Sequence, residues 1–471
     1  MVDKPFSLGR RNLLTAGITL LAAGGTTVAV NAITPFALPE TSHFGINHSY
    51  WSLALPPLNP GPTHDFHADI IVIGGGFTGL SAAYYMRQTL PKAKVVVLEA
   101  VRCGNGASGR NGAMLMTSTD DTYMEPDIDP TLHRRLYALT RDNIHRIRRL
   151  SLGVGIDCEI DLNGALQVAY SNSDADKMPA IAERLRAAGL PIEFWSGEKV
   201  ASAIGTHAYP AGLFDPGSGQ VHPGKLVAMW KRAAENAGAT IFEATPVVAI
   251  DQGPVIHLHL SSGVTASAPM VVLATNAYSS KLGYLRSDVV PIVNYVAITP
   301  PLTKDQLDLL GWTQRIPFND SRTNVVYAGL TRDNRLHIGG GIEEYEFNDG
   351  LFKPSDHGRG VKYLRQELTR LYPTLSAIPF ERTWWGYVDI SIDSTSSVGR
   401  MGRHENILYA IGLSGQGVNF TSVLGRILGD LAAERESQWT WLPYLNRKLP
   451  YIPNEPFRWL ALETGIRLLS Q

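Results

Sequence analysis

Cysteine is scarce in this sequence, which has only Cys103 and Cys158 among its 471 residues. The two form no C-x-x-C pair and match no zinc-site spacing, which excludes a cysteine-based metal or dithiol centre. We expect two buried free thiols, and a disulfide stays open if the protein is exported. The histidines of "HDFH", His64 and His67, have no third or fourth ligand nearby, so this stretch is interpreted as a linker.

An excess of charge is also missing. The chain has 42 basic and 43 acidic side chains and a net charge of −1, so its composition gives no reason to expect a nucleic acid partner. It also contains no internal repeat and no low-complexity tract.

The absence of a late histidine excludes a serine hydrolase. "GLSGQG" places Ser414 in a G-x-S-x-G pattern, but that mechanism needs a histidine after the serine, and none follows.

The most informative stretch that is present runs from Asp69 to Ala100. Short apolar runs predict two buried strands, and the residues between them predict a helix. These elements are expected at Ile70–Ile73, Leu80–Met86 and Lys94–Leu98. The order strand, helix, strand is a βαβ unit, the framework on which nucleotide-binding loops are built.

Three glycines in G-x-G-x-x-G spacing, Gly74, Gly76 and Gly79, follow the first strand. They permit a tight turn, close approach of a pyrophosphate and close helix–strand packing, while the helix N-terminus offers N–H groups to phosphates. Glu99 ends the second strand, 20 residues after Gly79, where a carboxylate accepts from ribose hydroxyls and repels a 2′-phosphate. The unit predicts dinucleotide binding but does not separate NAD from FAD.

The N-terminus resembles a twin-arginine export signal. Arg10 and Arg11 precede a mildly apolar run from Leu13 to Val30, and "VNA" at Val30–Ala32 matches a cleavage site. The run is long enough to span a bilayer, so an uncleaved anchor is the main alternative. We expect an exported, periplasmic protein whose membrane contact, if any, is made mainly through this N-terminus.

Nucleotide-type elements recur later in the chain. "SAPMVVLATNAYS" predicts another buried strand, and Ile407–Ala433 predicts a strand, a glycine turn and a long helix. Between them, Val293–Ile298 and Asn334–Gly340 predict strands of a separate antiparallel sheet. Two domains are therefore expected to be interleaved along the chain rather than consecutive.

Several ordered motifs together resemble the FAD-dependent amine and amino-acid oxidase family, the group that contains D-amino-acid oxidase. They are "SYWSLA", "GASGRNGA", "GQVHPGKL", "VVLATNAYS", "WWGYVDIS" and "GLSGQGVNFTS". The sequence is most similar to the γ-glutamylputrescine oxidase branch. The resemblance implies an α/β fold in which a Rossmann-like FAD-binding domain is interleaved with an α+β substrate domain built on an antiparallel sheet.

The expected segments follow from this resemblance and from the pattern of elements. They are a signal or anchor (1–33), a linker or N-terminal arm (34–67), three parts of the FAD-binding domain (68–160, 211–290 and 384–435), two parts of the substrate domain (161–210 and 291–383) and a C-terminal tail helix (436–471).

The resemblance also implies positions for FAD. Beside Gly74, Gly76, Gly79 and Glu99, the implied cofactor-binding residues are Ser108, Arg110, Asn111, Gly112, Val248, Gly415 and Gly417. Ser108, Arg110, Asn111 and Gly112 would line the pyrophosphate and the isoalloxazine ring. Val248 would contact the adenosine end of FAD through its backbone. The turn at Gly415 and Gly417 would bring a helix N-terminus to the flavin N1–C2=O edge, which gains negative charge on reduction.

Three departures from the family pattern stand out. Ala113 replaces a frequent glycine, Gln416 replaces a frequent histidine, and "IDSTSSVGR" lacks a common proline. The first two lie close to the expected flavin, so the acceptor or the substrate is expected to differ from that of other members.

The implied reaction is oxidation of a C–H next to an amine nitrogen, with hydride transfer to flavin N5 and hydrolysis of the resulting imine. It needs good positioning more than a strong base, so no catalytic residue is named. Segments expected to wall the substrate side contain Arg322, Tyr327, Arg332 and Tyr387, and an arginine there would suit a substrate carboxylate. The electron acceptor is O2 or a respiratory quinone. An FAD protein of the same fold with a non-amine substrate or without catalysis is the alternative.

Overall fold

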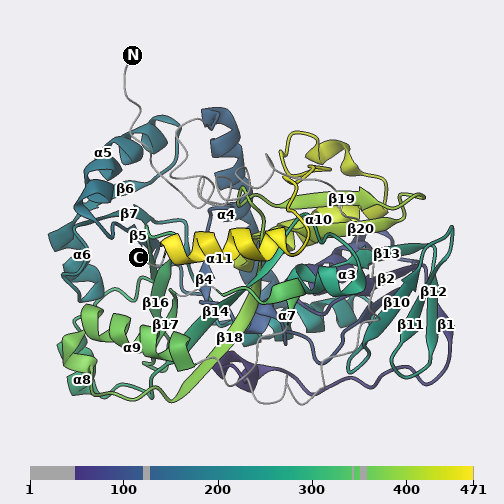
Figure 1. Ribbon diagram of the computed structural model, residues 1–471, viewed down its shortest axis with the longest axis horizontal. Helices are drawn as coiled ribbons and strands as arrows, with labels where there is room; N and C mark the ends of the chain where they lie inside the picture. Colours follow the sequence, from purple (N-terminus) through teal and green to yellow (C-terminus); the bar gives the residue numbers. More distant parts are fainter. Residues whose placement is uncertain (1–47, 120–127, 342–343, 351–357, 470–471) are drawn as a thin grey trace.

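The computed structural model describes residues 48–119, 128–341, 344–350 and 358–469. Strand pairing within these residues produces two large sheets and two small ones. In Figure 1 the largest sheet occupies the left and centre of the molecule, and the parallel sheet with its neighbours lies on the right.

The first large sheet has six strands and a parallel centre. In spatial order they are β19 (Ser397–Met401), β20 (Ile407–Ile411), β13 (Met270–Leu273), β2 (Ile70–Ile73), β3 (Val95–Leu98) and β9 (Thr240–Phe242). Only β19 is antiparallel to its neighbour. The predicted βαβ unit is confirmed, and it lies at the middle of this sheet.

Both faces of the parallel sheet are covered, which explains why its strands are continuous apolar runs. Ile70 and Val72 face one core cluster together with helices, and Ile71 and Ile73 face a second cluster on the other side. The helices are α3 (Phe77–Thr89), α4 (Pro130–Gly153), α7 (Pro223–Asn236) and α10 (Gly417–Ala432). The other face carries a small sheet of β1 (Phe66–His67), β12 (Thr265–Ala268), β11 (Ile256–Leu260) and β10 (Val247–Asp251).

The second large sheet is mostly antiparallel. In spatial order its strands are β18 (Arg382–Ile390), β14 (Val290–Ile298), β17 (Leu336–Gly340), β16 (Val326–Leu330), β15 (Phe318–Asp320), β5 (Ala165–Val168), β7 (Ala211–Asp215) and β6 (Glu193–Ser196). Four helices accompany it: α5 (Asn172–Ala187), α6 (Gly197–Ile204), α8 (Lys304–Leu310) and α9 (Gly358–Leu371). The expected interleaved α/β fold class is therefore confirmed.

Short elements connect these layers. They are η1 (Tyr50–Ala54), η2 (Ala107–Gly109), η3 (Asn276–Leu282), η4 (Phe347–Asp349), η6 (Pro373–Leu375), η7 (Glu436–Trp439), the pair β4 (Met114–Leu115) and β8 (Gly219–Gln220), and the C-terminal α11 (Phe457–Leu469). The helix α11 crosses the centre of the view in Figure 1.

The eight-stranded sheet extends past two of the segment ends expected from the sequence. Ala211–Asp215 pairs with β5 and β6, although the substrate segment was expected to end at 210. Arg382–Ile390 pairs with β14 along its whole length, so the expected boundary between 383 and 384 falls inside a strand. Strand pairing depends on partners far along the chain, which explains why local punctuation places such ends poorly.

Candidate functional site

Three parallel strands, β2, β13 and β20, end side by side at one edge of the six-stranded sheet. Leu273 pairs in register with Ile73 on one side and with Tyr409 on the other. Two helices, α3 and α10, start just beyond this edge. Ligands of open α/β sheets bind outside the carboxyl ends of the strands, so this edge is the candidate cofactor site.

The three predicted glycines are required by close backbone contacts at this edge. Gly74 has φ +109°, and a Cβ added there would lie 2.4 Å from the carbonyl oxygen of Ala274. A Cβ added at Gly79 would lie 1.9 Å from the carbonyl oxygen of Gly74, because α3 passes directly over the turn. Gly76 is the N-cap of α3, and a Cβ there would lie 2.9 Å from Ser108 Oγ.

The N-terminus of α3 faces the loop that contains η2. Gly76 provides no side-chain cap, and Ser108 Oγ instead accepts the N–H of Phe77 at 2.8 Å. The N–H groups of Thr78 and Gly79 follow in the same first turn, where an α-helix has no internal acceptors. A hydroxyl beside such a helix end is well suited to share a phosphate with it.

Glu99 is partly buried beside the same turn. Its Oε2 accepts the N–H of Gly75 at 2.7 Å, and its Oε1 accepts the N–H of Val101 at 3.0 Å. Burial raises the pKa of Glu99 to about 7, and the two N–H donors only partly oppose that rise. A further hydrogen-bond donor, such as a ribose hydroxyl, would stabilise the ionised form of this carboxylate.

The loop of residues 109–111 is held by three donors from distant parts of the chain, which the sequence alone did not reveal. The carbonyl of Gly109 accepts from Ser49 Oγ at 2.5 Å. The carbonyls of Arg110 and Asn111 accept from indole Nε1 of Trp384 and Trp51, each at 2.9 Å. C=O and N–H point in opposite directions across a trans peptide, so the N–H groups of Asn111 and Gly112 are turned to the opposite side, whereas that of Arg110 donates to the carbonyl of Ala107 at 3.1 Å. These two N–H groups are the ones that would meet a cofactor bound at this edge.

Trp51 gives a direct test of this arrangement. In Trp51→Phe the buried carbonyl of Asn111 loses its donor, so we expect the free energy of unfolding to fall by about 1–3 kcal/mol. We also expect the Kd for FAD to rise about tenfold, which corresponds to about 1.4 kcal/mol. Thermal unfolding and flavin fluorescence titration measure the two effects.

The matched control is Trp312→Phe. Trp312 Nε1 also donates to a carbonyl, that of Ile316 at 3.1 Å, but in the core of the eight-stranded sheet. This variant should lose stability and keep its FAD affinity. Equal FAD affinities for the two variants would contradict the role of Trp51.

The predicted loop residues themselves are tightly packed. Arg110 is buried and donates from Nε to the carbonyl of Asn105 at 2.6 Å and from Nη1 to that of Trp385 at 3.1 Å. A Cβ added at Gly112 would lie 2.4 Å from the ring of Tyr327. Ala113 has φ +61°, the left-handed region in which glycine is favoured. The departure noted at Ala113 is therefore a residue under backbone strain.

Val248 lies at an irregularity of β10. The register with β11 shifts between Val247 and Ala249, so Val248 has no partner in the ladder. A bulge of this kind leaves a backbone N–H and C=O without ladder bonds. The predicted backbone contact of Val248 with the adenosine end stays a prediction, and the bulge supplies groups that could make it.

The second helix end is formed by Gly415 and Gly417. Gly415 has φ +93°, and α10 starts at Gly417 after Gln416, whose side chain does not cap the helix. Asn419 Nδ2 donates to the carbonyl of Met116 at 2.8 Å, which ties α10 to the strand after the glycine loop. Both helix N-termini are thus gathered around residues 107–119.

One face of the eight-stranded sheet lies against the loop. Tyr327 packs on Gly112, and its hydroxyl donates to Asn294 Oδ1 at 3.1 Å. Burial raises the pKa of Tyr327, so it stays a neutral phenol. Tyr387 was also expected to wall the substrate side. Its side chain instead packs with Trp385 in the core cluster on the other face of β18. Tyr327 and Asn294 form an uncharged polar pair on the face of the sheet that lies against the loop.

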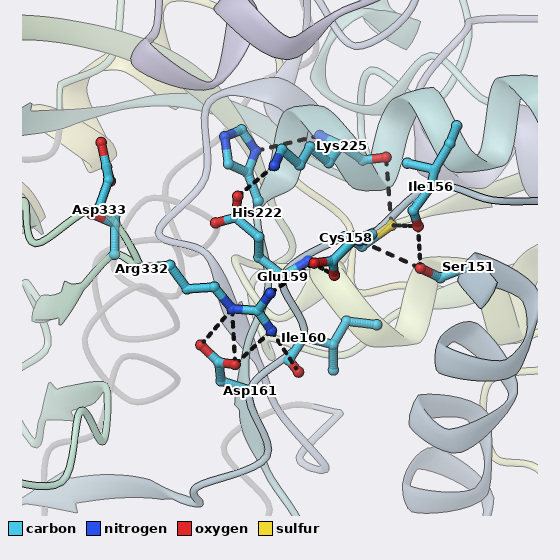
Figure 2. A network of polar contacts seen from close by, with 12 residues as sticks. Ser151, Ile156, Cys158, Glu159, Ile160, Asp161, His222, Lys225, Arg332 and Asp333 are labelled. Carbon is cyan, nitrogen blue, oxygen red and sulfur yellow. Dashed lines mark hydrogen bonds and ion pairs between the residues drawn. The ribbon is translucent and has the colours of Figure 1, made fainter.

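Arg332 does not wall the substrate side. Its guanidinium donates to Asp161 Oδ1 from Nη2 and to Asp157 Oδ2 from Nη1, each at 2.8 Å, and its side chain is 40% exposed. Figure 2 shows it in a surface network in which Lys225 pairs with Glu159. The expectation that Arg332 holds a substrate carboxylate is therefore not supported, because two acids already neutralise it.

Arg322 also forms ion pairs with acidic side chains of the protein. Its Nη2 lies 2.5 Å from Asp320 Oδ2 and 2.8 Å from Glu367 Oε2. Asp320 is completely buried, and its carboxylate also accepts the N–H of Val326. Arg322 therefore compensates buried charge within the eight-stranded sheet.

The two arginines should differ strongly in stability tests. Arg322→Gln leaves Asp320 buried without its main counter-charge, so we expect a loss of about 3–5 kcal/mol. Arg332→Gln removes an exposed ion pair and should cost about 1 kcal/mol or less. Urea unfolding of the two variants measures the difference. If Arg332→Gln instead left stability unchanged and raised KM at least tenfold, Arg332 would be a substrate ligand.

The two cysteines and Ser414 have buried or structural positions. Cys103 and Cys158 are free and buried, as expected, and burial raises the pKa of both thiols. Within the residues that the structure describes, no cluster of three or more His, Cys, Asp or Glu side chains could hold a metal ion. Ser414 Oγ accepts the N–H of Ser391 and has a structural role in its turn.

These observations fit a dinucleotide at the sheet edge. A phosphate-sized anion matches the glycine-capped end of α3 and Ser108, and a ribose matches Glu99. The loop of residues 107–113 and the end of α10 would hold the ring system between the parallel sheet and Tyr327. The predicted residues of α3, of the loop 107–113 and of the start of α10 lie around this edge, and their contacts with FAD, like that of Val248, stay predictions.

Comparison with known proteins gives a consistent picture. The profile of the DAO family, described as FAD dependent oxidoreductase, matches residues 69–431. The probable oxidoreductase OrdL of Haemophilus influenzae is 28% identical over 385 residues, which cover 80% of this chain and 84% of that protein. Gamma-glutamylputrescine oxidoreductase of Escherichia coli is 29% identical over 388 residues, which cover 80% and 87%.

A solved structure with a similar fold is glycine oxidase from Geobacillus kaustophilus. It superposes with a TM-score of 0.70 at 22% identity and covers 82% of this chain and 99% of that one. At this identity the likeness concerns the fold.

Proposed function

The chain belongs to the DAO family of FAD-dependent oxidoreductases, and from this premise we propose that it oxidises the C–N bond of a small amine or amino acid. The observation that carries the proposal is the meeting of the α3 and α10 N-termini and the glycine loop opposite the uncharged pair Tyr327 and Asn294. FAD, when bound, supplies a two-electron acceptor that takes hydride from the carbon next to nitrogen. Two relatives are named gamma-glutamylputrescine oxidoreductase and glycine oxidase. These names support an amine or amino acid as the electron donor.

The residues around the site suit a neutral amine. Tyr327 and Asn294 offer hydrogen bonds without charge, and the partly buried ring of Tyr327 packs against Gly112 and Gly339. Desolvation in such surroundings lowers the pKa of an ammonium group and so favours the neutral amine that can lose hydride. The fixed sheet then orients the C–H toward the loop, and the imine product is hydrolysed in water.

The test is the visible absorption spectrum of the purified protein before and after anaerobic addition of a mixed pool of amines and amino acids. Bleaching of the flavin bands supports the proposal, and splitting the pool identifies the substrate. Persistent bands would instead favour a non-amine substrate or a non-catalytic FAD protein. Peroxide formation in air then separates an oxidase from a dehydrogenase that passes electrons to a quinone.

Export is a further part of the proposal that rests on the sequence. The Arg10-Arg11 segment lies outside the described residues, and none of the described helices is long and apolar enough to cross a bilayer. We propose that the twin-arginine pathway carries the protein to the periplasm, with an uncleaved anchor as the alternative. Cell fractionation of wild type and of Arg10→Lys/Arg11→Lys tests this. Equal cytoplasmic location of both proteins would contradict it.

A further inference from the structure

Asp389 connects the two large sheets at the candidate flavin site. It pairs through its backbone with Pro291 in the eight-stranded sheet, while its side chain, in a residue that is 1% exposed, reaches the turn after β20. Oδ2 accepts the N–H groups of Gly412 at 2.6 Å and Leu413 at 3.1 Å, and its own carbonyl accepts the N–H of Ser414 at 3.0 Å. Three bonds from one residue therefore hold this turn.

The turn needs such support because its backbone is strained. Gly412, Ser414 and Gly415 have φ of +78°, +48° and +93°, all in the left-handed region. Ser414 is not a glycine, and a side chain in this region costs about 1 kcal/mol or more. Ser414 Oγ also accepts the N–H of Ser391 at 3.2 Å. Immediately after the turn, α10 starts at Gly417, so the direction of its N-terminus depends on these bonds.

The carboxylate of Asp389 is held by N–H donors rather than by a cation. Its other oxygen, Oδ1, is buried and has no hydrogen-bond partner in the part of the chain that the structure describes, and no ion pair there includes Asp389. Burial raises the pKa of Asp389 to about 6, so the group is ionised at pH 8. A buried negative charge close to a helix N-terminus partly opposes the positive end of the helix dipole.

We propose that Asp389 is a positioning residue for the flavin: its carboxylate orients the N-terminus of α10 toward the N1–C2=O edge, and its charge tunes the reduction potential. The inference rests on the proposed function, since it takes FAD to bind at this edge. The helix end stabilises the reduced, more negative flavin, and the carboxylate limits that stabilisation.

Asp389→Asn separates charge from positioning. The amide oxygen of the new side chain can still accept from Gly412 and Leu413, so the turn keeps these two bonds. At pH 8 we expect the equilibrium constant for two-electron reduction to rise about tenfold, which corresponds to about 30 mV. Equilibration with a reference dye during slow reduction measures it, and FAD content should stay near wild type.

The matched control is Asp430→Asn. Asp430 is equally a buried carboxylate of the α10 region, but it lies at the other end of the helix, where Trp439 Nε1 and Gln438 Nε2 donate to it at 2.8 Å. It should lose stability and keep the wild-type potential. A potential for Asp389→Asn that equals those of wild type and Asp430→Asn, or that falls, overturns the inference.

Ser414→Ala covers the case in which Asp389→Asn does not fold. This variant removes the hydrogen bond from the N–H of Ser391 and keeps the charge of Asp389. Because the turn is then less firmly held, the equilibrium constant for two-electron reduction should fall about threefold. An unchanged constant in Ser414→Ala would then overturn the inference. A wild-type protein that binds FAD but is reduced by no amine counts against the proposed function alone, because the dye titration still measures the potential.

Discussion

Gly79→Ala should produce protein that carries no flavin. The added Cβ would lie 1.9 Å from the carbonyl oxygen of Gly74. This is a steric clash with a backbone atom, which a change of side-chain rotamer cannot relieve. Relief requires α3 to move away from β2, which opens the core shared by both and displaces the N–H groups meant for the phosphates. We expect a loss of about 3 kcal/mol or more in stability.

The measurement is the ratio of flavin to protein absorbance after purification in the presence of FAD, together with the thermal midpoint. Gly263→Ala is the control. Gly263 also has a positive φ, +86°, but nothing lies within 4 Å of the added Cβ. It should cost only about 1 kcal/mol and keep the flavin. A Gly79→Ala protein as yellow and as stable as this control would refute the proposed packing of α3 on the turn.

The affinity for FAD should rise with pH because of Glu99. Burial raises the pKa of Glu99 to about 7, whereas its ordinary value is 4.5. The folded apoprotein therefore holds a proton that the unfolded chain has lost, so this group's contribution to stability falls as pH rises from 4.5 to 7. Ribose hydroxyls that donate to Glu99 favour its ionised form, so FAD binding releases this proton. Linkage then predicts a Kd about tenfold lower at pH 8 than at pH 6.

Fluorescence titration of the apoprotein from pH 5.5 to 8.5 tests this dependence. In Glu99→Gln one N–H acceptor becomes an amide donor facing Gly75 or Val101, and the charge is lost. We expect a Kd at pH 8 about 100-fold higher, equal to about 3 kcal/mol, and nearly constant with pH. A wild-type Kd that does not change between pH 6 and 8 would mean that Glu99 is already ionised in the apoprotein or does not contact the ribose.

The sequence alone was sufficient for the first βαβ unit and for the interleaved order of the domains. Its glycine spacing and apolar runs act over a few residues, and the structure forms the strand at Ile70–Ile73 and the turn as predicted. The family resemblance correctly indicated an FAD-dependent oxidoreductase, because several such short motifs occur in the right order.

The sequence was less informative about charges and loop support. Arg322 and Arg332 looked equally suited to a substrate carboxylate, yet each is neutralised by acids that include one remote in sequence, Glu367 for Arg322 and Asp161 for Arg332. Ser49, Trp51 and Trp384 hold consecutive carbonyls of one loop, although Trp384 lies 274 residues from Arg110 along the chain. No local pattern contains that information.

The sequence by itself therefore determined where a dinucleotide turn forms, since turns and strand periods depend on neighbouring residues. Only the tertiary structure decided which side chains face that turn, which arginines are paired and that Asp389 holds the start of α10. The physical reason is that charge compensation, burial and hydrogen bonding are set by partners that are near in space and remote in sequence.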